Sequence, residues 1–440
     1  MVRKKIFSLI LLVGVVGGMS IYGINYYASS IQNIEVIPYR ASAKTNEKGF
    51  QIDKYKSIES VAWINDNEVL TLTKKGEFKD SDSTTPIRYC SIYNLNTKIS
   101  KDFKEVSIDE FMGVSLDKNH VLYAEARVIP KRGTSEWQNA VDSGDIFHRN
   151  VKSLNLSTGK ITKLDTEKNN CSAEFIWVSN NKILVNYFDH WKIIDINRKV
   201  YAEDSYNAGK YDGAWISGVD DIKDLETSVE GKFYYTQDKN GKEGVKLCTV
   251  NVVTKEIKTI FSSQFSRTAD KKGKTIIIDK SNNNGKQSSD GLFLNITFGA
   301  VIMDESGNQL QDIKLPKGRN NKDYVLSPDG SKAAYVDFDN PMGNQPGPDP
   351  DTYIKIIDTK TGTIKEIVKV SCLKDKDVNI DYTILKIIDK DGKEAEKKVP
   401  LRVAISNICW DSTSAALSFT YGNSHVGNSQ IHTYIVSLDK

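Results

Sequence analysis

The 440-residue sequence has few of the side chains that build metal and nucleophilic centres, with only five cysteines and five histidines. No C-x-x-C pair and no Cys/His pair occurs at the spacing of a zinc site, so we expect no metal centre and no bound cofactor. Cys90, Cys248 and Cys409 lie in apolar stretches, where a free cysteine acts as a small buried hydrophobe. A single disulfide bond is an open alternative, but the sequence does not predict a fold held together by several disulfide bonds.

An excess of charge of one sign is also lacking. The chain has 60 Lys and Arg residues against 57 Asp and Glu residues, and both signs are interspersed along its length. A nucleic-acid-binding surface needs clustered basic residues, so we expect no nucleic acid partner.

Only one long apolar run occurs, and it lies at the N-terminus. Arg3, Lys4 and Lys5 precede Ile6 to Ile24, nineteen residues without a charge. As a helix this run would span roughly 28 Å, which is enough to cross the hydrocarbon core of a bilayer. Because the basic residues flank the run on its N-terminal side, we expect the rest of the chain outside the cytoplasm.

The same run could instead be a cleaved signal peptide, and the mature protein would then be secreted. Tyr26 and Tyr27 at the exit of the run favour a retained helix, because such aromatic residues prefer the membrane interface. The small-x-small stretch Ala41 to Ala43 comes late for a cleavage site. We therefore expect a retained single-pass anchor in residues 1–30, followed by a flexible tether in residues 31–47.

A tight turn followed at once by an apolar strand recurs along the remaining chain. The best copy is Ser327-Pro328-Asp329-Gly330, which precedes the strand pattern that ends at Val336. Degraded copies lie at 64–70, 116–122, 179–184, 229–234, 271–276 and 410–417. A second turn, rich in Asn, Asp and Gly, lies at 94–99, 155–161, 195–200, 251–257, 303–308 and 358–364.

Units of roughly 40 to 60 residues that contain strands and turns without a helical period are typical of a β-propeller. We therefore predict an all-β fold in which residues 48–440 form one propeller domain. We expect seven four-stranded blades, with six or eight blades as alternatives. Because the last blade is one strand short, Gly49 to Tyr55 should pair with the C-terminal strand and close the ring.

One blade carries a family resemblance. Ser327-Pro328-Asp329-Gly330 with its following strand, and Asp358 to Gly362 behind it, resemble the WD40-like repeats of the TolB-type propellers. The other blades match only in turn position and strand length. The resemblance implies an extracytoplasmic, non-enzymatic domain that binds partner proteins.

The lengths of the connections differ between the two faces that such a propeller would have. The two types of short turn would share one face, and the long connections would share the other. Long connections are predicted at 74–88, 127–150 and 204–222, and 378–403 should form a protruding hairpin. This asymmetry indicates that the face with long connections carries recognition.

Aromatic and polar side chains in these connections are the candidates for binding a ligand or partner. Alternatively, the side chains of Trp137 and Trp215 could pack their own loops against the propeller. Trp63, Trp177 and Trp410 precede first turns and are expected in the core between blades. The candidate binding residues are Trp137, Asp145, His148, Arg149, Tyr211, Trp215 and His425, accompanied by Tyr206 and Asp212.

Two stretches partly match patterns of catalytic or metal sites. Ser424 and His425 lie in a glycine-flanked stretch that lacks the strand-to-helix elbow of a serine nucleophile. Asp337 to Asn340 begins like a calcium loop, but Pro341 and Met342 replace an oxygen ligand and the turn glycine. Neither stretch predicts a catalytic or metal site.

We therefore expect a non-catalytic sensing or scaffold module, held at the cell membrane with its propeller on the extracytoplasmic side. Its partner would be a cell-envelope protein or an extracellular ligand. The alternative is a propeller enzyme that acts on a sugar or peptide at the mouth of the central channel. Such an enzyme would need two or more titratable side chains that converge there.

Overall fold

The computed structural model describes most of residues 50–438, which are almost entirely β-strand. Within this part the helical elements are α2 (Ser135–Asp142) and the short 3-10 helix η5 (Val370–Leu373). The residues that it does not describe are 1–49, 57, 80–83, 127–129, 131–132, 143–148, 165–172, 188, 207–213, 220–230, 239–244, 264–268, 280–285, 288–292, 295–298, 315–318, 340–351, 374–381, 389–393, 401–402, 424–430 and 439–440.

Five of the described sheets have four antiparallel strands. The first contains β9 (Glu174–Trp177), β10 (Lys182–Asn186), β11 (His190–Asp195) and β12 (Val200–Ser205). The second contains β13 (Ala214–Val219), β14 (Lys232–Asp238), β15 (Val245–Asn251) and β16 (Ile257–Ser263). The third contains β17 (Ala269–Lys272), β18 (Thr275–Asp279), β21 (Gly299–Asp304) and β22 (Gln309–Lys314). The fourth contains β23 (Arg319–Leu326), β24 (Lys332–Asp339), β25 (Tyr353–Asp358) and β26 (Ile364–Lys369).

The fifth four-stranded sheet joins the two ends of the described chain. It consists of β29 (Val403–Trp410), β30 (Ala416–Asn423), β31 (Ile431–Ser437) and, paired with β31, β1 (Gln51–Tyr55). Gln51 lies opposite Ser437 and Tyr55 opposite Thr433. The predicted closure by the strand near residue 50 is therefore confirmed.

A seven-stranded sheet completes the main body. It runs in chain order through β2 (Glu59–Asn65), β3 (Glu68–Lys79), β4 (Thr84–Asn94), β5 (Ser100–Val114), β6 (His120–Glu125), β7 (Val151–Asn155) and β8 (Ile161–Lys163). Two successive parts of β5 pair with different strands. Its part up to Ile108 pairs with β4, and its part from Ile108 to Val114 pairs with β6.

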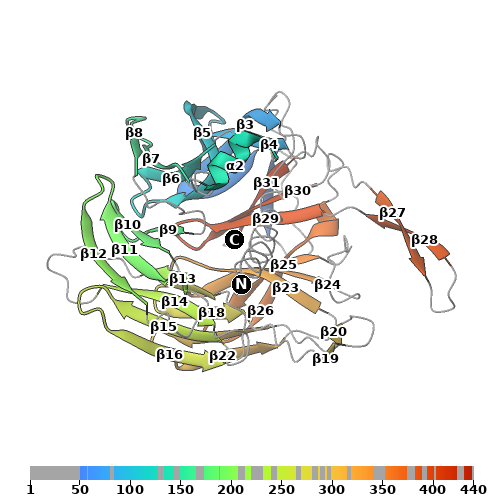
Figure 1. Cartoon of the computed structure of the whole chain (residues 1–440). Coiled ribbons are helices and arrows are strands. Elements are labelled where there is room, and N and C mark those ends of the chain that lie inside the picture. The colour runs from blue at the N-terminus through green and yellow to red at the C-terminus, as the bar shows by residue number, and fades with distance from the viewer. Residues whose placement is uncertain are drawn as a thin grey trace, which may run out of the picture.

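The sheets follow one another around a closed ring (Figure 1). Contacts join β2 to β29, β29 to β23, β23 to β17, β17 to β13 and β13 to β10, and β5 contacts β9. Because β2 and β5 belong to one sheet, this series returns to its start. A closed ring of radially arranged antiparallel sheets is a propeller-like architecture, so the predicted all-β class is confirmed.

The short turns between first and second strands and between third and fourth strands share one face, which we call the turn face. In the second kind of turn, an Asn or Asp side chain accepts two backbone amides. Asn94 Oδ1 accepts from Asn96 at 3.1 Å and Thr97 at 2.9 Å, and Asp358 Oδ1 accepts from Lys360 at 3.0 Å and Thr361 at 2.7 Å. These bonds hold the backbone in a tight reversal. All six predicted second turns lie between third and fourth strands.

The first turns are equally specific. Ser327 Oγ donates to Asp329 Oδ1 at 2.6 Å and accepts from the Lys332 amide at 2.9 Å. Ser115 makes the same bonds to Asp117 and His120, although Lys118 replaces glycine at the left-handed position. The best copy of the turn and the degraded copy at 116–122 therefore share the same hydrogen bonds as well as a similar sequence.

Apolar side chains fill the space between neighbouring sheets. Trp63, Trp177 and Trp410 are at most 7% exposed, as predicted for core between blades. The Trp63 indole donates to Ser418 Oγ at 3.0 Å, and the Trp410 indole donates to the Val325 carbonyl at 2.9 Å. Each of these bonds crosses from one sheet to the next, so the tryptophans also align the sheets.

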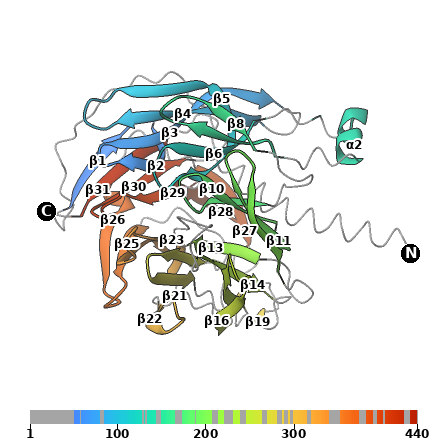
Figure 2. The same ribbon diagram turned by 90° about the vertical axis from the view of Figure 1, so that its left-hand side faces the viewer.

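The opposite face, which we call the loop face, carries α2 and the connections between second and third strands. Figure 2 shows α2 standing away from the sheets on the side opposite the end of β31. β27 (Tyr382–Ile388) pairs with β28 (Glu394–Pro400) in the predicted protruding hairpin (Figure 1). A second two-stranded sheet joins β19 (Lys286–Gln287) and β20 (Phe293–Leu294).

Three predicted loop features need correction. Residues 74–88 form mostly the ends of β3 and β4, because the two strands extend together as a long hairpin. The predicted connection 204–222 spans only 206–213, because β12 continues to Ser205 and β13 begins at Ala214. α2 replaces irregular loop within 127–150. Among the described residues no helix is long and apolar enough to cross a membrane, and Ile6 to Ile24 lies outside them.

Candidate binding face

Four side chains occupy equivalent places at the loop-face ends of innermost strands. We call each succession of four antiparallel strands a unit, and the seven-stranded sheet contains two units that share β5. In four units, one residue of the first strand lies opposite the fifth residue of the second strand. These residues are Glu59, Glu110, Glu174 and Trp215. The units that contribute them are consecutive around the ring. We call these four residues the mouth group, because innermost strands surround the axis of the ring.

The predicted candidate Arg149 binds one member of this group. Its Nη2 lies 3.3 Å from Glu110 Oε2, and its Nη1 donates to the Ala173 carbonyl at 3.1 Å. Arg149 is 27% exposed in its side chain and Glu110 is 47% exposed, so the pair remains accessible to solvent. Arg149 thus ties β7 to the following sheet and also presents charge at the mouth.

Glu59 is the buried member of the mouth group. It is 2% exposed, and Arg88 on β4 lies 3.9 Å from its Oε2. Burial raises the pKa of Glu59, while the Arg88 charge and the Asn407 side chain oppose that change. This carboxyl is therefore held between the first and last sheets.

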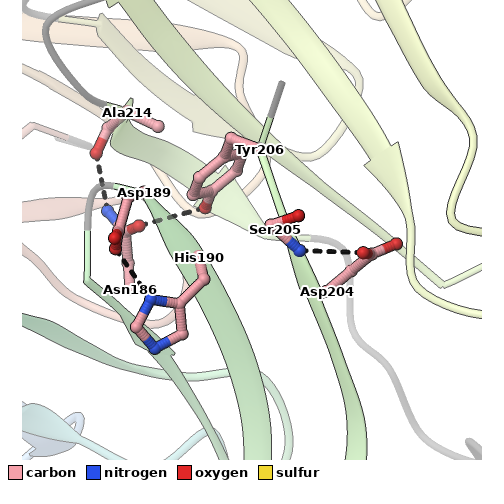
Figure 3. A network of polar contacts seen from close by, with 7 residues as sticks. All are labelled: Asn186, Asp189, His190, Asp204, Ser205, Tyr206 and Ala214. Atoms are coloured by element: carbon pink, nitrogen blue, oxygen red, sulfur yellow. Dashed lines mark hydrogen bonds and ion pairs between the residues drawn. The ribbon is translucent and has the colours of Figure 1, made fainter. Parts of the chain in front are cut away.

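Glu174 belongs to the network drawn in Figure 3, although the picture leaves its side chain out. Asn186 is fully buried, and its Nδ2 donates to Glu174 Oε2 at 2.6 Å and to the Ala214 carbonyl at 2.7 Å (Figure 3). Tyr206 OH donates to Asn186 Oδ1 at 3.0 Å. Glu174 Oε2 also accepts the Ile216 amide of the next sheet at 3.0 Å. Burial raises the pKa of Glu174, and the bonds from Ile216 and Asn186 oppose it.

This use of Glu174 repeats elsewhere in the ring. An innermost strand is a sheet edge, so some of its amides lack a partner within the sheet. Asp270 Oδ2 accepts the Leu326 amide at 2.8 Å, and Thr433 Oγ1 accepts the Ser60 amide at 3.1 Å. In each case a side chain of one sheet satisfies the inner edge of the next. Glu174 and Asp270 therefore have a structural role.

The sequence did not indicate a partly exposed cluster next to this network, formed by Tyr187, Asp189, His190 and Lys192. His190 Nδ1 lies 2.7 Å from Asp189 Oδ1, and the His190 ring stacks on Tyr187 at 4.5 Å between centroids and 8° between planes. Lys192 Nζ lies 5.0 Å from the centre of the Tyr187 ring. Figure 3 places Asp189 and His190 beside the Asn186 network. The connection at 187–189 is short, whereas the sequence predicts recognition on the long connections.

The helix α2 displays the candidate Trp137. Thr134 caps the helix, because its Oγ1 accepts the Trp137 amide at 3.2 Å and its carbonyl accepts the Gln138 amide at 3.0 Å. None of the helix residues is buried, and Trp137 is partly exposed. Because α2 buries no side chain in the core, most of its surface is accessible to solvent, with Trp137, Ala140 and Val141 only partly exposed.

Of the other candidates, only Trp215 and Tyr206 lie among the described residues. Trp215 lies on strand β13 in the mouth group rather than in a loop, and it is partly exposed. Tyr206 is 3% exposed and packs in the core against Phe233 and Tyr235, so it is not a surface residue. Asp145, His148, Tyr211, Asp212 and His425 lie outside the described residues.

A pocket of about 500 Å³ lies on the turn face, between the units that start with β2 and with the second half of β5. Ile64, Ile92 and Leu156 give it apolar walls, and Asn94 and Asn119 supply amides. Across the pocket, Lys101 Nζ donates to the Leu156 carbonyl at 2.7 Å.

Among the described residues, no three His, Cys, Asp or Glu side chains lie closely enough together to hold a metal ion. Asp337 lies in β24, and its carboxylate forms an ion pair with Lys355.

Comparison with known proteins finds no matching family model and no matching curated protein. Among solved structures, the β-propeller domain of the Trilobed protease from Pyrococcus furiosus is 11% identical, with a TM-score of 0.49 over 88% of this chain and 98% of that chain. Oligogalacturonate lyase from Vibrio parahaemolyticus is 10% identical, with a TM-score of 0.48 over 94% and 99%. A putative TolB from Agrobacterium tumefaciens is 12% identical, with a TM-score of 0.37 over 64% and 88%. At this level of similarity, these structures carry no functional argument.

Proposed function

We propose that this chain is a seven-bladed propeller, tethered to the cell membrane, that recognises a partner through its loop face without catalysing a reaction. The blade count is supported by the double use of β5. Counting its two halves as separate strands divides the seven-stranded sheet into two four-stranded blades, β2 to β5 and β5 to β8. With the five four-stranded sheets, seven blades follow.

The membrane tether is supported by the sequence. Ile6 to Ile24 is apolar and follows three basic residues, so the propeller would lie on the extracytoplasmic side. If the segment is cleaved, the propeller would be secreted. Protease added to intact cells without an outer barrier should digest the propeller, and protection in such cells would contradict this topology.

Recognition by the loop face is carried by one observation: the accessible Glu110–Arg149 pair and the partly exposed Trp215 lie at equivalent places around the mouth, in units separated by the one that contains Glu174. A rim that combines a charged pair with an accessible aromatic ring is the composition of a recognition surface. The His190 cluster and α2 extend this surface. A cell-envelope protein or an extracellular ligand would be the partner.

The test is capture of partners by the full chain from detergent-solubilised membranes. Trp137→Ala, His190→Ala and Trp215→Ala should each keep the melting temperature nearly unchanged, and at least one should lower partner recovery roughly tenfold or more. Lys160→Ala and Lys360→Ala on the turn face are matched controls. Full recovery with all three loop-face variants, and loss with the controls, would show that the wrong face was chosen.

A second function, hydrolysis of a sugar or peptide at the channel mouth, is favoured by Glu59 and Glu110, which occupy equivalent places in neighbouring units. Two carboxyl groups with different protonation are what acid–base hydrolysis needs. Burial raises the pKa of both Glu59 and Glu110, and the Arg149 charge opposes that change at Glu110. Glu59 would then be the proton donor, and Glu110, ion-paired with Arg149, would be the base. Turnover of a glycan or peptide library that disappears in Glu59→Gln and Glu110→Gln would replace the non-catalytic proposal.

A further inference from the structure

The link between β26 and β29 is long and contains strands of its own. It runs from Val370 to Arg402, and β27 and β28 form a hairpin within it. Figure 1 shows this hairpin standing out from the ring. Among the described residues, β27 and β28 pair only with each other. A two-stranded hairpin on its own is marginally stable in water, whereas three or more strands with an apolar face are stable. We therefore expect a further strand to pair with this hairpin.

The two outer edges of the hairpin differ in how well their sequences oppose pairing with another strand. Exposed edge strands of natural proteins usually carry charged residues or proline, which prevent such pairing. β27 has the sequence Tyr-Thr-Ile-Leu-Lys-Ile-Ile, in which the one charged residue is Lys386. In β28, most residues are charged or proline, namely Glu394, Glu396, Lys397, Lys398 and Pro400. The edge of β27 is therefore the one suited to receive another strand.

The register of the hairpin gathers most of its apolar residues on one face. Residues directly opposite each other in an antiparallel pair share a face of the sheet. The opposite pairs of the more polar face include Lys386 with Glu396 and Ile388 with Glu394. The pairs of the more apolar face are Thr383 with Val399, Leu385 with Lys397 and Ile387 with Ala395. A strand with apolar residues at alternate positions would extend this second face.

A second copy of β27 is such a strand. In an antiparallel pair of two β27 strands centred on Leu385, the two Leu385 residues lie opposite each other, and Thr383 of one copy lies opposite Ile387 of the other. No two charged residues are opposite in this register. The same arrangement of two β28 strands, centred on Lys397, would place two lysines opposite each other, which is destabilising. The sequence of β27 is thus complementary to itself, whereas that of β28 is not.

We propose that two copies of this chain form a dimer by antiparallel pairing of their β27 strands. The two hairpins then make one four-stranded sheet in the order β28, β27, β27, β28, which has the strand number that an isolated sheet needs. The pairing has twofold symmetry, the commonest symmetry of protein dimers. This inference goes beyond the proposed function, and it requires neither the membrane anchor nor a particular partner of the loop face.

The first experiment is cysteine cross-linking of the full chain in detergent under mild oxidation. Opposite residues in such a pair have Cβ atoms about 4.5–5.5 Å apart, so Leu385→Cys should give a disulfide-linked dimer. Lys397→Cys is the matched control and should give at least tenfold less dimer, because three strand spacings, about 14 Å, would separate the two cysteines. Thr383→Cys and Ile387→Cys should cross-link only when the two variants are mixed. The parent chain gives the background from the native cysteines.

The second experiment measures the mass of the full chain in detergent by light scattering. The parent chain should have the mass of two chains. Leu385→Lys should raise the concentration for half-dimerisation roughly tenfold or more, because it places two lysines opposite each other. The control Ala395→Lys adds the same charge to β28 and should keep the dimer. Both variants should keep the melting temperature of the parent chain, since the described strands of the hairpin pair with no strand of the ring.

Three results would overturn the proposal. The first is a parent chain that stays monomeric at every concentration. The second is a dimer in which Leu385→Cys and Lys397→Cys cross-link equally, because the contact would then lie elsewhere. The third is a Leu385→Cys chain that, in its native membranes, cross-links to a different protein instead of a second copy, which would make the edge of β27 a docking site for that protein. Each result leaves the proposed loop-face recognition to its own test.

Discussion

Removing β1 should open the ring at the junction of its two ends. The perturbation is deletion of Phe50 to Tyr55, which eliminates the five residue pairs between β1 and β31. It leaves the amides and carbonyls of β31 without partners along one edge. It also removes Phe50, which is 6% exposed and packs with Ala334, Val368 and other buried residues.

The magnitude follows from these losses. Net contributions of about 1 kcal/mol for each ladder hydrogen bond, and about 3 kcal/mol for a buried phenylalanine, give a loss on the order of 5 kcal/mol or more. That is comparable with the total stability of a typical domain, and it corresponds to a fall in melting temperature of roughly 10 °C.

The assay is thermal unfolding of the full chain in detergent, followed by circular dichroism. Deletion of an equal length of the tether, residues 42–47, is the control and should leave the melting temperature unchanged. Phe50→Ala should give about half of the deletion's effect, because it keeps the ladder and loses only the packing. A β1 deletion that melts within a degree or two of the parent chain would refute the role of β1 in closing the ring.

Two further predictions concern the turns. Gly159 and Lys98 occupy the same left-handed position in equivalent turns, with φ of 75° and 62°. Gly159→Ala should therefore lower stability by about 1 kcal/mol, and Lys98→Gly should raise it by up to about 1 kcal/mol, because a Cβ is strained at this backbone conformation. Chemical denaturation measures both changes in the free energy of unfolding. If both variants were stabilised or both destabilised, the two residues would not occupy the same left-handed position. For Asp329, burial alone would raise the pKa, but hydrogen bonds from Ser327, Ser331 and Ser414 outweigh it and hold the pKa below its ordinary value. Its ionised form thus stabilises the fold above the unfolded-state pKa of about 3.9, and that stabilisation is lost as the pH falls below this value. Asp329→Asn should show a weaker loss of stability between pH 5 and about pH 2, whereas an acid limb identical to that of the parent chain would contradict this account.

The sequence by itself determined the features that depend on neighbouring residues. The turns were predictable because Ser327 with Asp329, or Asn94 with Thr97, satisfy the backbone within a few residues. Strand alternation then gave the all-β class. The protruding hairpin was predicted for the same reason, since β27 and β28 pair only with each other.

Only the tertiary structure decided which side chains come together around the ring. Glu59, Glu110 and Glu174 are far apart in the chain, and they share a level only because each strand has its particular register. Tyr206 belongs to a predicted surface loop, yet it is buried because its hydroxyl donates to Asn186 and its ring packs against the next sheet. Each of these arrangements is a property of contacts distant in sequence.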